Sequence, residues 1–110
     1  MAEREIQANE AESAANGTRA RVVIEYCPRC GWLLRAAWLA QELLTTFHAT
    51  LGEVALKPAE QGVFRVCVGE HLVWSRQEDG GFPSAAELKR RVRDVVAPGL
   101  PLGHADGGDK

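Results

Sequence analysis

Four short stretches of the chain alternate between hydrophobic and polar residues, which is the pattern of β-strands. In a strand, successive side chains point to opposite faces, so alternate residues share a face. Val22, Ile24 and Tyr26 therefore lie on one face of the first stretch. Each stretch has one strongly apolar face, which predicts a sheet with helices packed on one side only. We expect strands over residues 21–26, 53–57, 63–68 and 71–75, with a tight hairpin between the last two.

After the first strand the pattern changes to the period of a helix, which we expect over residues 28–47. Leu34 and Trp38 lie one turn apart and outside its apolar stripe. They are expected to contact a second element or the C-terminal tail; alternatively, they form an exposed docking surface for a partner. The stripe expected to be buried consists of Leu33, Ala36, Ala37, Ala40, Leu43, Leu44 and Phe47.

A second helix is expected to start at Ser84, because Ser84 and Glu87 have the spacing of a capping box. Pro98 ends this helix. Its apolar stripe is Leu88, Val92, Val95 and Val96. Its basic side chains are expected on a solvated outer surface, and they are Lys89, Arg90, Arg91 and Arg93.

The order of these elements is β-α-β-β-β-α, which predicts an α/β protein folded as a two-layer sandwich. The chain has 110 residues, of which 45% are hydrophobic and 25% are charged, as in one ordinary globular domain. We expect that domain over residues 20–97, between a disordered N-terminal tail at 1–19 and a C-terminal tail at 98–110.

Charge and hydropathy argue against two classes of partner. The formal net charge is −2, so nucleic-acid binding is not expected. No apolar run approaches the roughly 18 residues that a membrane span needs. The first residues resemble no signal peptide, and a cytoplasmic location is expected.

The segment Cys27-Pro28-Arg29-Cys30 joins the first strand to the first helix. Pro28 suits the first helical position, so Cys27 is expected at the N-cap, where backbone N–H groups stabilise a thiolate. Two cysteines three positions apart on one turn can also form a disulfide. A redox-active dithiol at the first strand–helix junction of an α/β domain is the arrangement of the thioredoxin-like fold.

Several segments together resemble the selenoprotein W/T/H (Rdx) family, in its bacterial branch. They cover about residues 21–106 and are Cys27 to Cys30, Phe64 to Gly69, Gly80-Gly81-Phe82-Pro83, Glu87-Leu88-Lys89, and Leu102 to Asp106.

The resemblance implies a thioredoxin-like thiol-disulfide oxidoreductase with Cys27 and Cys30 as its redox centre, and an antioxidant role. Its partners would be protein or small-molecule thiols and disulfides. No bound cofactor is expected, and glutathione is the candidate co-substrate. Family members with selenocysteine carry it at the position of Cys30, whereas the N-cap favours Cys27 as the attacking group, so the order of attack stays open.

Three alternatives remain. The first is a zinc-binding module in which Cys27, Cys30, Cys67 and His71 are the ligands. By itself, Cys67 is interpreted as a half-buried strand residue. The second alternative is a glutaredoxin, which shares the Cys-Pro-x-Cys motif. The third is a redox-switched interaction module that docks its partner at Leu34 and Trp38.

Overall fold

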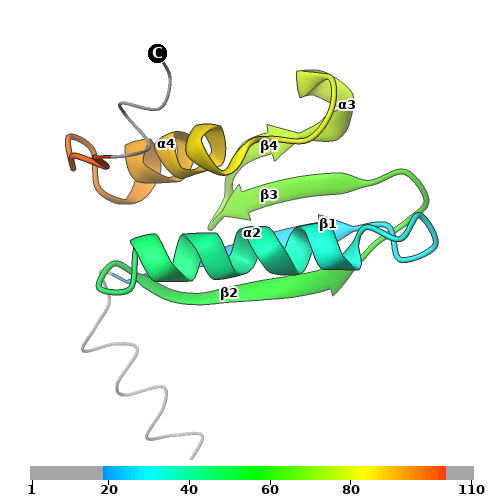
Figure 1. Ribbon diagram of the computed structural model, residues 1–110, viewed down its shortest axis with the longest axis horizontal. Helices are drawn as coiled ribbons and strands as arrows, with labels where there is room; N and C mark the ends of the chain where they lie inside the picture. The colour runs from blue at the N-terminus through cyan, green and yellow to red at the C-terminus, as the bar shows by residue number, and fades with distance from the viewer. Residues whose placement is uncertain (1–18, 104–110) are drawn as a thin grey trace, which may run out of the picture.

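A computed structural model of the chain describes residues 19–103 (Figure 1). The tail expected at 1–19 lies outside the described residues apart from Arg19, and so do residues 104–110 of the C-terminal tail. The elements are β1 (Ala20–Tyr26), α2 (Leu33–Thr46), β2 (Leu51–Pro58), β3 (Phe64–Val68), β4 (His71–Ser75), α3 (Arg76–Asp79) and α4 (Ala85–Val96).

The strands form one four-stranded sheet in the order β2-β1-β3-β4. β1 is parallel to β2, and α2 is the crossover between them. β3 runs antiparallel to both β1 and β4. The α/β thioredoxin-like sandwich expected from the sequence is therefore confirmed, and its four strands lie where the alternating stretches predicted them.

The core fills the space between the sheet and the two longer helices, α2 and α4, which pack on the same side of it (Figure 1). The sheet contributes the side chains predicted to share a face, including Val22 and Ile24 from β1 and Val66 from β3. On the opposite face Arg65 binds Glu25 across the strands, with 2.6 Å between its Nη2 and Oε1 of Glu25. One apolar and one charged face explain why the helices cover only one side.

The buried face of α2 differs from the predicted stripe. Leu39, which the stripe left out, is 1% exposed, whereas Leu33 and Leu44 are 45% and 40% exposed. At about 100° per residue, the helix is turned by roughly 40° from the predicted orientation. Apolar residues occupy more than half of its circumference, so periodicity alone did not determine which part meets the sheet. The buried residues are Ala36, Leu39, Ala40, Leu43 and, just beyond the helix, Phe47.

α4 begins at the predicted cap, since the Ser84 hydroxyl accepts a hydrogen bond from the backbone N–H of Glu87 at 3.1 Å. The reciprocal half of the capping box does not form, because the Glu87 carboxylate binds Arg90 and Arg91 instead. Lys89 was also predicted wrongly. It is 4% exposed, and its Nζ lies 2.9 Å from Oε1 of Glu42 on α2, so it joins the two helices.

The polar segment between β4 and α4 contains the one-turn helix α3, which hydropathy did not predict. Asp79 accepts a hydrogen bond from the backbone N–H of Ser75 at 2.9 Å. Gly80 ends the turn with a φ of +79°. No helix within residues 19–103 is long and apolar enough to cross a bilayer.

Candidate redox site

Cys27 directly follows β1, and residues 28–31 form a turn rather than the start of the helix. α2 begins at Leu33, with Trp32 as its N-cap. The expected helix start and the N-cap position of Cys27 are therefore wrong. The cause is Gly31, whose φ of +77° lies in the left-handed region and cannot continue a right-handed helix. The backbone N–H of Gly31 closes the turn on the carbonyl of Pro28 at 3.2 Å.

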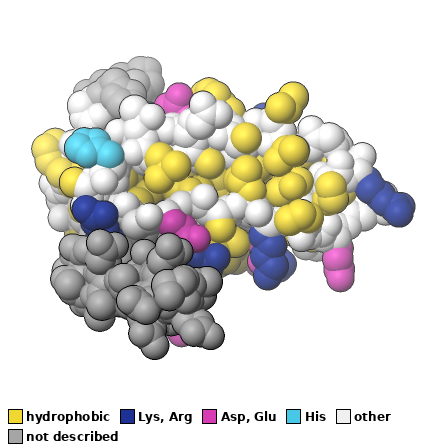
Figure 2. All heavy atoms as spheres, turned by 90° about the horizontal axis from the view of Figure 1, so that it is seen from below, with side chains coloured by type: hydrophobic (Ala, Val, Ile, Leu, Met, Phe, Trp, Pro, Cys, Tyr) yellow, Lys and Arg dark blue, Asp and Glu magenta, His cyan; other side chains and the backbone are white. Residues whose placement is uncertain are grey.

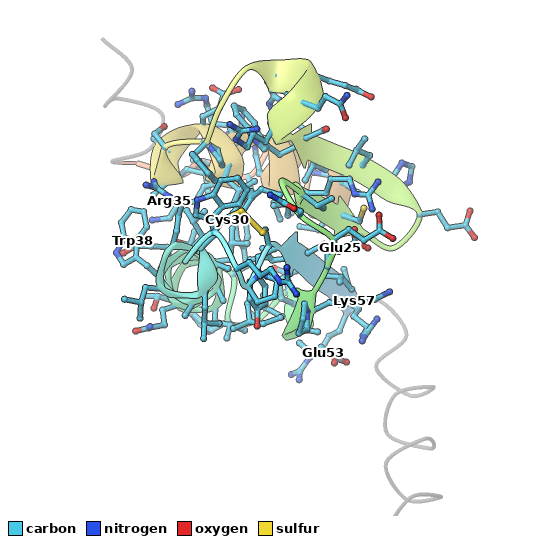
Figure 3. All side chains as sticks on the ribbon, turned by 90° about the vertical axis from the view of Figure 1, so that its right-hand side faces the viewer. Glu25, Cys30, Arg35, Trp38, Glu53 and Lys57 are labelled. Carbon is cyan, nitrogen blue, oxygen red and sulfur yellow. A yellow bond between two sulfur atoms is a disulfide. The ribbon has the colours of Figure 1, made fainter. Side chains whose placement is uncertain are left out.

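Cys27 and Cys30 are joined by a disulfide, with their Cα atoms 5.4 Å apart (Figure 3). The two residues differ in accessibility, because Cys27 is completely buried and Cys30 is exposed. The backbone N–H of Cys30 donates a hydrogen bond to the sulfur of Cys27 at 3.2 Å. The turn thus supplies to Cys27 one of the N–H donors that the sequence had assigned to a helix N-terminus.

An aromatic cluster of Trp32, Phe64 and Phe82 packs beside this turn. The ring of Phe82 meets Trp32 and Phe64 edge to face, with centroid distances of 4.9 Å and 5.0 Å. Trp74 anchors the loop that carries Phe82, because its indole N–H donates to the carbonyl of Gly81 at 2.9 Å. The Gly80-Gly81-Phe82-Pro83 segment therefore holds an aromatic ring against Trp32, the N-cap of α2.

Two arginines lie on the rings of this cluster. Cζ of Arg35 is 4.2 Å from the centroid of Phe82, and Cζ of Arg76 is 5.0 Å from the centroid of Trp32. Sequence reasoning assigned no role to either arginine. A signal was available only for Arg35, which follows Trp32 by three positions and so lies on the same side of the first helical turn.

The structure does not bring Cys67 and His71 to the cysteine turn. Cys67 pairs with Val23, and His71 pairs with Val68 at the opposite end of the sheet from Cys27. Val23 lies four positions before Cys27, a distance of about 13 Å along β1. No three His, Cys, Asp or Glu residues within 19–103 are grouped so that they could hold a metal. The four-ligand zinc set is therefore a wrong prediction.

Cys67 is half-buried, as its strand pattern predicted. Burial raises the pKa of its thiol, the nearby Glu25 carboxylate raises it further, and Arg65 opposes this effect. A raised pKa keeps the thiol protonated at neutral pH, and a protonated thiol is a poor nucleophile. Cys67 therefore differs chemically from a redox-active cysteine.

Leu34 and Trp38 are 80% and 49% exposed, so neither is buried against a second element within residues 19–103. A contact with residues 104–110 of the C-terminal tail lies outside the described residues. In Figure 3, Trp38 lies at the outer edge of the molecule, whereas Cys30 lies nearer the centre of the view. Hydrophobic side chains also gather in a band over the face formed by α2 and β2 (Figure 2), where Leu33, Leu44 and Leu56 are exposed. The docking role assigned to Leu34 and Trp38 stays a prediction.

Comparison with known proteins places this geometry in a family. The model of the Rdx family matches residues 21–94. Among curated proteins, migration and invasion enhancer 1 of Bos taurus is 30% identical over 86 residues, which cover 78% of this chain and 72% of that protein. The mouse protein of the same name is 29% identical over 77 residues, covering 70% and 65%.

Solved structures of similar proteins agree with the family match. The crystal structure of a selenoprotein W-related protein from Vibrio cholerae superposes with a TM-score of 0.70 at 46% identity, covering 71% of this chain and 98% of that one. A crystal structure from Bordetella parapertussis gives a TM-score of 0.68 at 59% identity, covering 69% and 96%. With its Cys-x-x-Cys pair at disulfide distance and the family match over most of its length, the chain belongs to the Rdx family.

Proposed function

We propose that the protein is a thiol-disulfide oxidoreductase in which Cys27 and Cys30 form the redox couple. The observation that carries the proposal is the pairing of an exposed cysteine with a fully buried one at disulfide distance. The exposed member can meet a substrate sulfur, and the buried member can then reach only its partner. A reversible dithiol centre needs these two roles, one cysteine that attacks the substrate disulfide and one that resolves the mixed disulfide.

The exposure of Cys30 supports Cys30 as the attacking residue, and the burial of Cys27 supports Cys27 as the resolving residue. In the reduced protein, the Cys30 thiolate bonds to one sulfur of a substrate disulfide, and the other sulfur leaves as a thiolate that takes up a proton. The Cys27 thiolate, stabilised by the N–H of Cys30, then attacks the Cys30 sulfur and releases the second thiol. Two electrons pass from the protein to the substrate, and the Cys27–Cys30 disulfide remains.

A second thiol must return the protein to its reduced form. Glutathione is the co-substrate that we propose for this step, in the reducing environment of a cytoplasmic location. Two glutathione molecules would reduce the disulfide and leave as glutathione disulfide, so that the cycle balances. Such a cycle would serve an antioxidant role.

The proposal is tested by mixing the reduced protein with bis(2-hydroxyethyl) disulfide, stopping the reaction with acid, and measuring intact and peptide masses. We expect the loss of two hydrogens at Cys27 and Cys30, the release of two mercaptoethanol molecules, and recovery of the dithiol with glutathione. Cys67→Ser is the matched control and should react as the wild type does. An unreactive wild type, or a Cys30→Ser variant oxidised at an unchanged rate, would contradict the proposal.

A further inference from the structure

The guanidinium groups of Arg35 and Arg76 frame the aromatic cluster from two different elements. Arg35 comes from the first turn of α2 and lies 4.2 Å above Phe82. Arg76 begins α3 and lies 5.0 Å from Trp32 and 5.8 Å from Phe82. A guanidinium that rests on an aromatic ring uses its flat face for that contact, so its N–H groups stay available at the edge.

Neither arginine has a carboxylate partner among residues 19–103. This separates them from Arg65, whose charge is balanced by Glu25 at 2.6 Å, and from Arg91, which binds Asp79 and Glu87. Figure 3 shows Glu25 on the other side of the disulfide from Arg35. The uncompensated cations therefore produce a positive potential beside the exposed cysteine.

Arg29 adds a third cation within the cysteine turn. It directly precedes Cys30, is exposed, and has no carboxylate partner in the described part of the chain. Because it rests on no ring, its side chain is less constrained than those of Arg35 and Arg76. It raises the local potential, whereas the two stacked arginines supply fixed binding groups.

A surface pocket of about 420 Å³ adjoins the cluster. Arg76 and Phe64 line it, and the ring of Phe64 also contacts Trp32 at a centroid distance of 6.5 Å. Glu78 is the carboxylate in the pocket lining, but it lies two positions from Arg76 on a helical turn, where side chains do not face each other. The pocket gives space for a small molecule beside the Arg76 guanidinium.

We propose that the protein selects small disulfides that carry carboxylate groups, and that Arg35 and Arg76 bind those carboxylates while Cys30 attacks the sulfur. Arginine recognises a carboxylate through two parallel hydrogen bonds, and the stacked guanidinium is already held for this contact. The inference rests on the proposed function, because it names the substrate class of the same cysteine pair.

The test compares three symmetric disulfides that differ in charge: 3,3′-dithiodipropionate, bis(2-hydroxyethyl) disulfide and cystamine. The rate at which each oxidises the reduced protein is divided by its rate with dithiothreitol, which removes differences in intrinsic reactivity. We expect the normalised rate to fall from the anionic to the neutral to the cationic disulfide. Added salt should reduce the differences between the three normalised rates, because it screens exposed charges.

Variants assign the preference to the two arginines. Arg76→Gln and Arg35→Gln should each lower the normalised rate with the anionic disulfide by roughly twofold to fivefold, as expected for exposed ion pairs. The rate with the neutral disulfide should fall by a smaller factor, because it loses only the effect of the positive potential on the Cys30 thiolate and no contact to a carboxylate. Arg76→Lys keeps the charge and should restore part of the preference. Arg21→Gln is the matched control, because it removes the same charge at the far end of β1 and should change nothing.

The outcomes separate this inference from the proposed function. Equal normalised rates for all three disulfides, or an anionic preference that survives in both Gln variants, would overturn the inference and leave the oxidoreductase intact. A protein that none of the disulfides oxidises would overturn both. An acidic peptide disulfide is added as a fourth oxidant, and a preference for it over 3,3′-dithiodipropionate would contradict the small-molecule assignment.

Discussion

The indole of Trp32 meets the ring of Phe82 edge to face, with 4.9 Å between the ring centroids. Trp32 caps α2 directly after the cysteine turn, whereas Phe82 lies in the loop that leads into α4. The contact therefore ties the two ends of the site together, although the residues are far apart in the sequence. Phe64 completes the cluster from the start of β3, at 5.0 Å from Phe82.

Phe82→Ala should lower the free energy of unfolding by about 2–3 kcal/mol, because it removes two edge-to-face contacts and leaves a partial cavity. Urea denaturation followed by far-UV circular dichroism measures this change. Phe82→Leu is the control, since it keeps most of the volume and should cost less than Phe82→Ala. Equal stability of Phe82→Ala and the wild type would show that the cluster contributes no stability.

Gly31→Ala should destabilise the protein by about 1–2 kcal/mol, because alanine at a φ of +77° is strained. The new Cβ would meet no atom within 4 Å, so the cost comes from the backbone alone. Gly31→Asn should cost less, because asparagine tolerates the left-handed region better. Urea denaturation midpoints of the two variants test this prediction. If Gly31 were part of the helix, Gly31→Ala would instead stabilise the protein by about 1 kcal/mol.

Leu39→Ala and Leu34→Ala should have very different effects, although both residues lie on α2. Leu39 is 1% exposed, and its truncation should cost about 2–4 kcal/mol. Leu34 is 80% exposed, and its truncation should change the free energy of unfolding by less than about 0.5 kcal/mol. Parallel urea titrations test the pair, and a reversed order would mean that α2 presents its other face to the sheet.

Acid should weaken the fold partly through Glu87. Hydrogen bonds from Arg91 and then Arg90 lower the pKa of the Glu87 carboxyl from its usual value of 4.5. A group with a lowered folded-state pKa stabilises the fold above its unfolded pKa, and this stabilisation is lost as the pH falls through the folded pKa. Glu87→Gln should therefore flatten the loss of stability below about pH 4.5. Urea unfolding midpoints of the wild type and of Glu87→Gln, measured over that pH range, test this prediction. If the two midpoints fall equally steeply with decreasing pH, Glu87 makes no such contribution.

Local patterns predicted the elements because the alternation of residues such as Val22 and Ile24 reflects burial within a single strand. The disulfide was predictable for a similar reason, since Cys27 and Cys30 are close in sequence. The start of α2 was not predictable, because a glycine in a helical pattern can either continue the helix or break it. Which of the two occurs at Gly31 depends on the turn formed by residues 28–31.

Long-range contacts account for the other differences between the structure and what the sequence predicted. Lys89 is buried because Glu42 on α2 supplies its counter-charge, and no local pattern reveals such a pair. The arginines of the site were missed for the same reason, since Arg76 reaches Trp32 only in the folded chain. The wrong zinc ligands, Cys67 and His71, followed from counting residue types without the register that places them away from Cys27.

The most direct test of the cysteine assignment is to trap the mixed disulfide. Reduced Cys27→Ser and Cys30→Ser variants, each also carrying Cys67→Ser, are mixed with bis(2-hydroxyethyl) disulfide, and the adducts are located by peptide mass. We expect a rapid, stable adduct on Cys30 in the first variant and little reaction at the buried Cys27 in the second. A rapid adduct on Cys27, with none on Cys30, would contradict the account.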